Sequence, residues 1–180
     1  MKSMYLVMAV AIVGLAGCAS NRAPEVAGKI RDGLKQAGLN DVTVSQNRDK
    51  AVVTLGGNVK QDADRARAEQ IARPIAAGQV IADEIAVLPA GNESAARSVD
   101  SDLDRGIQAN LDAALIQANI KGVDHSTKNG VVTLTGNLET PQLRADAEHV
   151  ATTVPNVQQV VNEINVKNQR ATTSQADRSR

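Results

Sequence analysis

An internal repeat is the feature that most restricts the folds open to this chain. Residues 51–59 (AVVTLGGNV) and residues 130–138 (GVVTLTGNL) share a valine-rich pattern at a separation of 79 residues. The same separation relates residues 84–85 to residues 163–164 without a gap. A gap-free correspondence of this extent indicates two copies of one fold, each of which buries its own apolar residues.

Each copy is predicted to follow the order helix, strand, strand, helix, strand. In the first copy, apolar residues recur at helical spacing over residues 26–37, and two strands follow over 42–44 and 51–59. A second apolar helical stripe covers residues 68–75. Alternating apolar residues over 81–87 predict the third strand.

The second copy repeats this order. Apolar stripes at helical spacing lie at 103–115 and 143–154, and the second helix is predicted to start with Thr140 as N-cap and Pro141 as its first residue. Strands two and three are joined through a helix, which favours parallel pairing. The predicted fold class is therefore α+β, with two tandem αββαβ domains, each made of two helices packed on a small three-stranded mixed sheet.

Polar composition separates the two copies from each other and from the end of the chain. The connector is rich in polar residues, and the final segment has no apolar period, which is typical of disorder. We expect each copy to fold separately. The predicted boundaries are a signal peptide at 1–17, a tether at 18–24, a first domain at 25–88, a linker at 89–100, a second domain at 101–167 and a disordered tail at 168–180.

The first residues have the pattern of a secretory signal. Lys2 precedes an uncharged apolar run of 12 residues, 5–16. Such a run fits a signal peptide and is shorter than the roughly 20 residues that span a bilayer. It ends in residues 15–18 (LAGC), which resemble the lipobox of bacterial lipoproteins and contain the only cysteine of the chain.

The lipobox resemblance implies cleavage before Cys18, a diacylglycerol on its thiol and an acyl chain such as palmitate on the new amino terminus. Stable anchoring takes more than one acyl chain, and this arrangement supplies enough of them. Ala19 stands where an aspartate would imply retention in the inner membrane, so the resemblance implies the outer membrane and a periplasmic orientation. The alternative is a plain signal peptide that is cut elsewhere and leaves Cys18 as an ordinary thiol.

Composition excludes several classes of function. Tyr5 is the only aromatic residue, so the chain after the predicted signal has none with which to stack nucleic-acid bases. Lys2 is the only charge before Cys18, which leaves 19 basic and 20 acidic side chains and a net charge of −1. No general basic field attracts nucleic acid, and we expect no nucleic-acid partner.

No catalytic or cofactor-binding motif stands out, and we expect a protein that is not an enzyme and holds no metal or cofactor. His125 and His149 fall in different predicted elements, whereas a zinc site needs about four good ligands, so both are interpreted as surface histidines. Gly57 and Gly136 each end a Val-Thr-Leu strand. We interpret them as points of bending or close backbone approach rather than as a phosphate-binding loop.

The repeated pattern resembles the BON domain, a bacterial envelope module with the αββαβ order. The resemblance rests on the Val-Val-Thr-Leu strand in both copies, on the Ala-Glu pair in the helix that follows, and on residues 162–166 (NEINV). Together with the lipobox, it is similar to dual-BON-domain outer-membrane lipoproteins and to the osmotically induced periplasmic proteins that share the domain. It implies roles in envelope integrity or osmotic stress, with binding of anionic phospholipid or of an envelope protein. The alternative is a protein-interaction or chaperone-like module whose only lipid contact is its anchor.

Charge places the candidate lipid contact on the first copy. Residues 25–88 carry nine basic and nine acidic side chains, whereas residues 102–167 carry five basic and eight acidic ones. The best basic cluster is Lys29, Arg31 and Lys35 in the first predicted helix. The alternative interpretation of these three residues is an ordinary solvated helix face.

Replacing Cys18 by serine tests the anchor. Cys18→Ser removes the thiol that the lipobox resemblance makes the lipid acceptor, so we expect no incorporation of a clickable fatty acid and accumulation of the uncleaved precursor. Metabolic labelling followed by immunoprecipitation measures both. Absence of label in the wild-type protein would refute the anchor.

Overall fold

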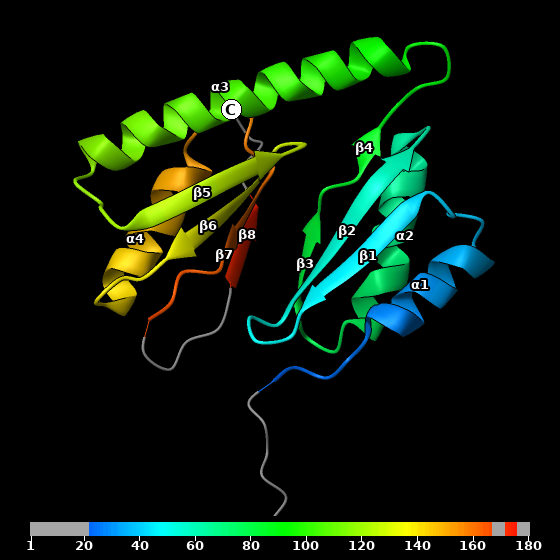
Figure 1. Cartoon of the computed structure of the whole chain (residues 1–180), viewed down its shortest axis with the longest axis horizontal. Coiled ribbons are helices and arrows are strands. Elements are labelled where there is room, and N and C mark those ends of the chain that lie inside the picture. The colour runs from blue at the N-terminus through cyan, green and yellow to red at the C-terminus, as the bar shows by residue number, and fades with distance from the viewer. Residues whose placement is uncertain (1–21, 167–171, 176–180) are drawn as a thin grey trace, which may run out of the picture.

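Two α+β repeats follow one another along the chain in the computed structural model, which describes residues 22–166 and 172–175 (Figure 1). In the first repeat, β2 pairs antiparallel with β1 and parallel with both β3 and β4. The single third strand expected from the sequence is interrupted at residues 84–85. The elements of repeat 1 are α1 (Ala27–Gln36), β1 (Val42–Asn47), β2 (Val52–Val59), α2 (Asp62–Ile75), β3 (Val80–Asp83) and β4 (Ala86–Val87).

The second repeat has the same order, with one further strand at its end. Its sheet runs β5-β6-β7-β8, with β6 and β7 parallel and the other pairs antiparallel. Thr140 caps α4 as expected, because its Oγ1 accepts a hydrogen bond from the N–H of Leu143 at 3.2 Å. The predicted α+β class with two tandem αββαβ units is confirmed. The elements of repeat 2 are α3 (Glu93–Gln117), β5 (Val123–Lys128), β6 (Val131–Gly136), α4 (Pro141–Thr152), β7 (Gln159–Asn162) and β8 (Thr172–Gln175).

Each repeat has a core of its own that is built from aliphatic side chains. The largest wholly buried side chains are shared evenly between the two repeats. Equivalent positions supply them, as the repeat in the sequence requires. They are Ile30, Leu34, Leu55 and Ile85 in repeat 1, and Ile107, Leu111, Leu134 and Ile164 in repeat 2.

The two strand-ending glycines lie where the backbone comes close to itself, as expected. Gly57 has φ +85°, and a Cβ at this position would overlap the carbonyl oxygen of Asp41. Gly136 has φ +130°, and a Cβ would overlap the carbonyl oxygen of Gly122. Because both the backbone angle and the space exclude a side chain, glycine is required for the start of each repeat's first strand to meet the end of its second.

The predicted linker at 89–100 is helical over residues 93–100, which form the first turns of α3. Two alanines, which favour helix, follow Glu93 in this segment. One turn later, the carboxylate of Asp104 accepts hydrogen bonds from the N–H groups of Asn129 and Gly130 at 2.8 and 2.9 Å. These contacts hold α3 on the β5–β6 turn, and the polar surface of its exposed first turns concealed the helix in the sequence.

The two ends of the described chain also differ from expectation. Residues 172–175, predicted to be disordered, form β8 on the edge of β7, because two threonines suit a strand and the edge supplies partners that a four-residue pattern cannot reveal. Residues 22–24, assigned to the tether, pack on repeat 1, where Ala23 and Arg48 exchange hydrogen bonds of 2.9 and 2.8 Å. The predicted signal peptide, Cys18 and the rest of the predicted tail lie outside the described residues.

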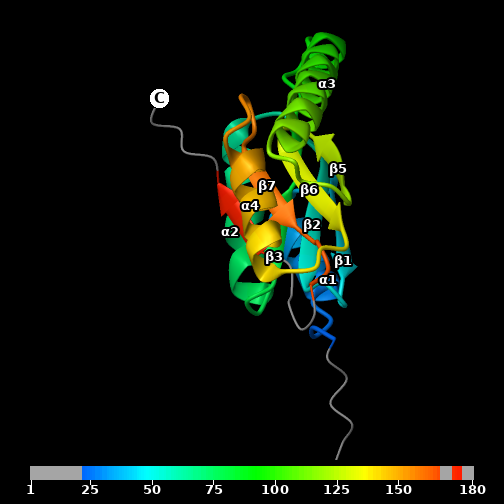
Figure 2. The ribbon, with the colours of Figure 1, turned by 90° about the vertical axis from the view of Figure 1, so that its left-hand side faces the viewer.

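The two sheets face one another, with α1 and α2 on one side of the pair and α4 on the other (Figures 1 and 2). A third apolar cluster fills the space between the sheets. It is made of Val52 and Ala82 from repeat 1 and Val131 and Val161 from repeat 2, with Val80 packed against it. Each repeat therefore buries residues on both faces of its sheet, and the expected separate folding of the two copies is modified by this shared contact.

Hydrogen bonds across the interface follow the symmetry of the repeat. The Lys50 Nζ donates to the carbonyl oxygen of Glu163 at 2.8 Å, and the Asn129 Nδ2 donates to the carbonyl oxygen of Glu84 at 2.7 Å. Residues 50 and 129 are equivalent in the repeat, and so are residues 84 and 163. The two bonds are thus related by a pseudo-twofold axis, as in an isologous dimer interface.

Truncating one core leucine measures how strongly the repeats depend on each other. Leu134→Ala should destabilise repeat 2 by about 2–5 kcal/mol, because it leaves a cavity in a core without aromatic residues. Repeat 1 should lose less stability, through the shared cluster alone. Hydrogen exchange resolved by mass spectrometry measures both, with exposed Thr135→Ala as the control. Equal loss of protection in both repeats would contradict two separate cores.

Candidate functional site

The three candidate lipid-binding residues lie on α1, and all are exposed. A helix turns by roughly 100° per residue, so Arg31 and Lys35 share one flank while Lys29 lies about 160° around the axis from Arg31. The Arg31 Nη2 reaches over β1 to the carbonyl oxygen of Val44 at 3.5 Å. The structure therefore brings together Arg31 and Lys35 but separates Lys29 from them.

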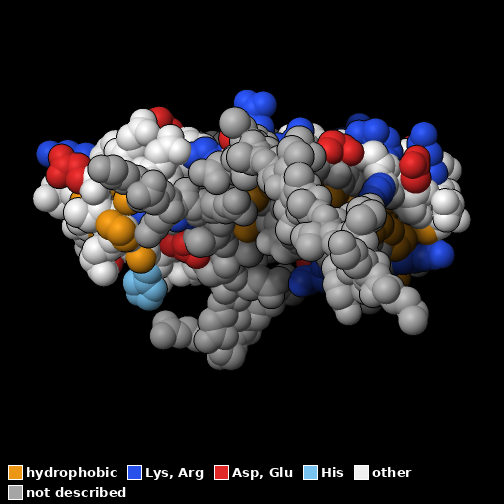
Figure 3. Space-filling model, turned by 90° about the horizontal axis from the view of Figure 1, so that it is seen from below, with side chains coloured by type: hydrophobic (Ala, Val, Ile, Leu, Met, Phe, Trp, Pro, Cys, Tyr) orange, Lys and Arg blue, Asp and Glu red, His pale blue; other side chains and the backbone are white. Residues whose placement is uncertain are grey.

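The segment before α1 is fixed to one end of repeat 1, beside the β1–β2 turn. The carbonyl oxygen of Pro24 accepts hydrogen bonds from Gln46 Nε2 at 2.7 Å and from Gln79 Nε2 at 3.0 Å. Arg22 pairs with Asp49 at 2.7 Å on the surface. Figure 3 looks at this end, where Lys and Arg side chains are more frequent over repeat 1, on the right, than over repeat 2.

A groove follows the outer edge of β3 between α2 and repeat 2, and we call it the β3-edge groove. It consists of two adjoining hollows of about 510 and 420 Å³, which share Glu69 and Gln159. Both repeats contribute to its walls, so it exists only in the paired arrangement. It is lined by Asp62, Arg65, Ala66, Glu69, Arg73, Gly78, Gln79, Val80, Ile81, Asp83, Gln158 and Gln159.

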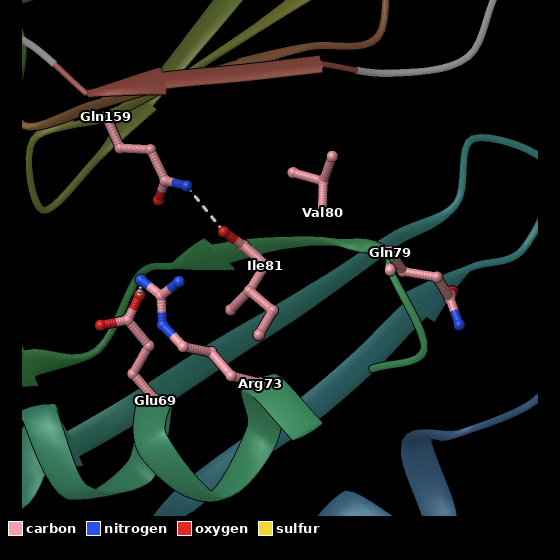
Figure 4. Close-up of a pocket in the computed structure, with 7 residues that line it drawn as sticks. Glu69, Arg73, Gln79, Val80, Ile81 and Gln159 are labelled. Atoms are coloured by element: carbon pink, nitrogen blue, oxygen red, sulfur yellow. Dashed lines mark hydrogen bonds and ion pairs between the residues drawn. The ribbon is translucent and has the colours of Figure 1, made fainter. Parts of the chain in front are cut away.

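Hydrogen bonds along the groove centre on one amide side chain. The Gln159 Nε2 donates to the carbonyl oxygen of Ile81 at 2.6 Å (Figure 4). The Gln159 Oε1 accepts from the N–H of Asp83 at 3.1 Å. Gln159 thus pairs with the outer edge of β3 as a strand residue would. Gln159 was not among the predicted site residues. The signal in the sequence is that repeat 2 has a glutamine where repeat 1 has Val80.

Four of the five charged side chains that line the groove form two ion pairs. Arg65 and Asp83 form an ion pair at 2.8 Å, with side chains only 20% and 14% exposed, and Arg73 pairs with Glu69 at 2.5 Å near the surface. Arg65 also donates to Gln158 of repeat 2 at 3.3 Å. This polar, paired lining suits recognition of hydrogen-bonding groups.

The equivalent place in repeat 2 is closed. Arg144, the counterpart of Arg65, is buried and donates to the carbonyl oxygen of Asn162 at 2.9 Å. Burial lowers the pKa of Arg144, an effect that Glu148 opposes. Asn162 replaces Asp83, and its Nδ2 bonds the Arg144 carbonyl oxygen and Glu148. With β8 on the edge of β7, repeat 2 has its strand edge covered.

The interpretation of both histidines as surface residues holds for His149, which is exposed, but is wrong for His125. The His125 side chain is only 9% exposed, and its Nε2 lies 2.9 Å from Asp112 on α3. The strand registers explain the difference, because His125 pairs with Leu134 as Val44 pairs with Leu55. His125 therefore takes an inward position that the offset in the sequence did not reveal. Among the described residues, no group of three or more acidic, histidine or cysteine side chains is placed to hold a metal ion.

Comparison with protein families identifies the repeat. The model of the BON domain matches residues 13–89 and residues 100–168, which together make up most of the chain. The chain belongs to the BON-domain family. BON domains are generally non-enzymatic binding modules and are associated with phospholipid binding and with osmotic-stress or envelope proteins. The second match begins at residue 100, after the first turns of α3, so those turns extend beyond the BON repeat itself.

Two solved structures are similar to the BON pair at 14% sequence identity. Both are of CdsD, a structural protein of the type III secretion system of Chlamydia trachomatis, and one is described as its C-terminal domain. The similarity covers 78% of this chain and 64% and 61% of those chains, with TM-scores of 0.30 and 0.32. This chain thus spans less than two thirds of either. Comparison with curated proteins gives no match.

Glu163 lies where the two repeats meet. Burial raises the pKa of its carboxyl, and the ammonium of Lys50 and a hydrogen bond from Asn47 oppose this shift. Its Oε2 lies 3.4 Å from the Asn47 Nδ2. The charged form of Glu163 is therefore disfavoured in the folded protein, and the interface carries this cost at neutral pH.

Replacing Glu163 by glutamine should remove that cost. Between the ordinary pKa of 4.5 and the raised folded value, the folded protein binds more protons than the unfolded chain, so the free energy of unfolding falls as pH rises. Glu163→Gln should flatten this pH dependence and should be more stable than wild type at pH values above the raised pKa of Glu163. Urea unfolding from about pH 4 to pH 8 measures it, with exposed Glu139→Gln as control. A variant less stable than wild type at neutral pH would contradict the argument.

Proposed function

We propose that this BON-domain protein is a non-enzymatic lipoprotein of the bacterial cell envelope. Lipids on Cys18 hold it in the outer membrane facing the periplasm, where it supports membrane integrity or osmotic tolerance by contacting phospholipid. The lipobox pattern and the associations of the BON family support this proposal. Within the described ranges, no helix combines the length and apolar character needed to cross a bilayer.

The observation that carries the proposal is the packing of Ala23 and Pro24 on repeat 1. Only residues 19–21 separate Cys18 from Arg22, where the packed segment begins. An extended chain covers at most about 3.5 Å per residue, so repeat 1 would stay within roughly 14 Å of a lipidated Cys18. A tether this short presents the β1–β2 end of repeat 1 to the membrane and limits how far the protein can tumble.

Basic residues near this end then act at short range. A Lys or Arg near an anionic surface contributes about 1 kcal/mol, and the attraction is screened within about 8 Å at physiological salt. Lys29 lies in the first turn of α1, close to Pro24, while Arg31 and Lys35 extend along one flank. Three such residues give weak binding, so the anchor supplies proximity and α1 sets the orientation.

The β3-edge groove favours a second candidate function. A groove with hydrogen-bonding walls suits a polypeptide better than an anionic lipid headgroup, since both of its arginines are already paired with carboxylates. In this alternative, the protein is a periplasmic interaction or chaperone-like module, and its anchor is its only contact with lipid.

Co-sedimentation with vesicles separates these functions. The unlipidated chain from residue 19 onward should bind vesicles rich in phosphatidylglycerol at low salt, and Lys29→Gln, Arg31→Gln and Lys35→Gln combined should abolish binding. Testing Lys29→Gln against the Arg31→Gln, Lys35→Gln pair shows which flank contributes. Lys121→Gln on repeat 2 is the control.

Equal binding by the triple variant and the wild type would refute this lipid site. No binding by either form at low salt would favour the interaction module instead.

A further inference from the structure

The backbone of β3 offers hydrogen-bonding groups on the edge that faces away from β2. The N–H of Val80 donates to Ala51 at 2.9 Å and that of Glu84 donates to Leu55 at 2.8 Å, so even-numbered residues face β2. Ile81 and Asp83 therefore direct their N–H and C=O groups outward, into the β3-edge groove. In the part of the chain that the structure describes, no strand pairs with this edge.

Repeat 2 shows which kind of segment can pair with such a strand edge. The equivalent edge of β7 is paired antiparallel with β8, in the register Val160 with Ser174 and Asn162 with Thr172. Residues 93–96 are the equivalents of β8 at the repeat separation of 79, and they belong to α3, so they do not form a strand on β3. The hollow of about 510 Å³ beside Val80 and Ile81 borders the edge that such a strand would pair with.

We propose that the β3-edge groove binds an extended segment of a partner polypeptide by strand addition. The segment pairs antiparallel with Ile81 and Asp83 as β8 pairs with β7. The side-chain amide of Gln159 gives way to it, and so does the Arg65 Nη2, which donates to the carbonyl oxygen of Asp83 at 3.3 Å. Strand addition to an exposed edge takes its affinity from main-chain hydrogen bonds and its specificity from the pockets that alternate side chains enter.

The partner segment should be short and rich in threonine and serine. The sequence of β8, Thr-Thr-Ser-Gln, is the one that this fold already accepts on the equivalent edge. Both arginines of the wall, Arg65 and Arg73, are already paired with Asp83 and Glu69, so an acidic segment gains little there. This inference deepens the interaction-module alternative and does not depend on lipid contact, so the vesicle experiment and the one below can fail separately.

The probe is a fluorescent peptide with the sequence of residues 170–177, RATTSQAD, titrated into the chain from residue 19 onward. Its own β8 keeps the β7 edge occupied. We expect saturable binding that shifts the amide resonances of Ile81 and Asp83, and no binding of a scrambled peptide. Gln159→Ala should bind the peptide about tenfold more tightly, because two competing hydrogen bonds to β3 are removed.

Two further variants sharpen the test. Gln158 also lies in the groove, but it accepts a hydrogen bond from Arg65 and does not bond the β3 backbone. The peptide affinity of Gln158→Ala should therefore stay within about twofold of wild type. Ile81→Pro removes an outward N–H without touching the β2 ladder, and should abolish binding. If Ile81→Pro fails to fold, the comparison of Gln159→Ala with Gln158→Ala still shows whether the peptide binds at the edge of β3.

Several outcomes would overturn the proposal. Equal affinity of wild type and Gln159→Ala would show that the edge of β3 is not the binding site. Amide shifts at Val160 and Asn162 in place of Ile81 and Asp83 would mean that the peptide merely exchanges with β8. Self-association of Gln159→Ala without peptide would assign the groove to a second copy of this chain.

Discussion

The packing of the two sheets against each other is the contact on which the rest of the molecule depends. A domain of about 60 residues buries only about 60% of the surface of its unfolded chain and is marginally stable alone. Without aromatic residues, each repeat has little apolar volume for its own core. The cluster of Val52, Ala82, Val131 and Val161 buries the second face of both sheets. Valine and alanine are small, which allows the facing strands to approach closely.

The hydrogen bonds across the interface are symmetric, whereas the strand edges at the β3-edge groove are not. Lys50 and Asn129 form matching bonds across the pseudo-twofold axis. The symmetry fails at the outer edges of β3 and β7. Gln159 in repeat 2 is aligned with Val80 in repeat 1, and among the described residues no strand pairs with β3 as β8 pairs with β7. Two identical repeats would cover the outer edges of β3 and β7 in the same way. The uncovered edge of β3 therefore comes from differences between the two repeats and is not a general feature of the BON fold.

The sequence predicted what depends on local pattern and missed what depends on partners. Helical stripes, strand order and the close approach at Gly57 follow from residues near one another in the chain. The contact between the two sheets also has a signal in the sequence. Consecutive valines at 52–53 and 131–132 indicate strands that are buried on both faces. By contrast, β8 is four residues long, and the inward position of His125 follows from a strand register that differs from the repeat offset.

Placement of the basic candidates shows the same limit. Arg31 and Lys35 are four residues apart and share a flank of α1. Lys29 was grouped with them by closeness in sequence, and helical geometry separates it from them. Gln159 has no local signal beyond its polarity in an apolar strand. Its role arises only when repeat 2 is placed against the edge of β3, which no pattern within one repeat specifies.

One side chain links the two surfaces. Gln79 is buried, donates to the carbonyl oxygen of Pro24 and lines the β3-edge groove at its end. The start of the packed chain and the start of β3 are therefore held together at one end of repeat 1. If lipids on Cys18 anchor the chain, the groove stays within a short, fixed reach of the membrane surface. Tethering of this kind raises the effective concentration of partners confined to the same surface far above that of soluble ones. Weak strand pairing in the groove would then suffice to select membrane-associated polypeptides, and neither surface would need high affinity of its own.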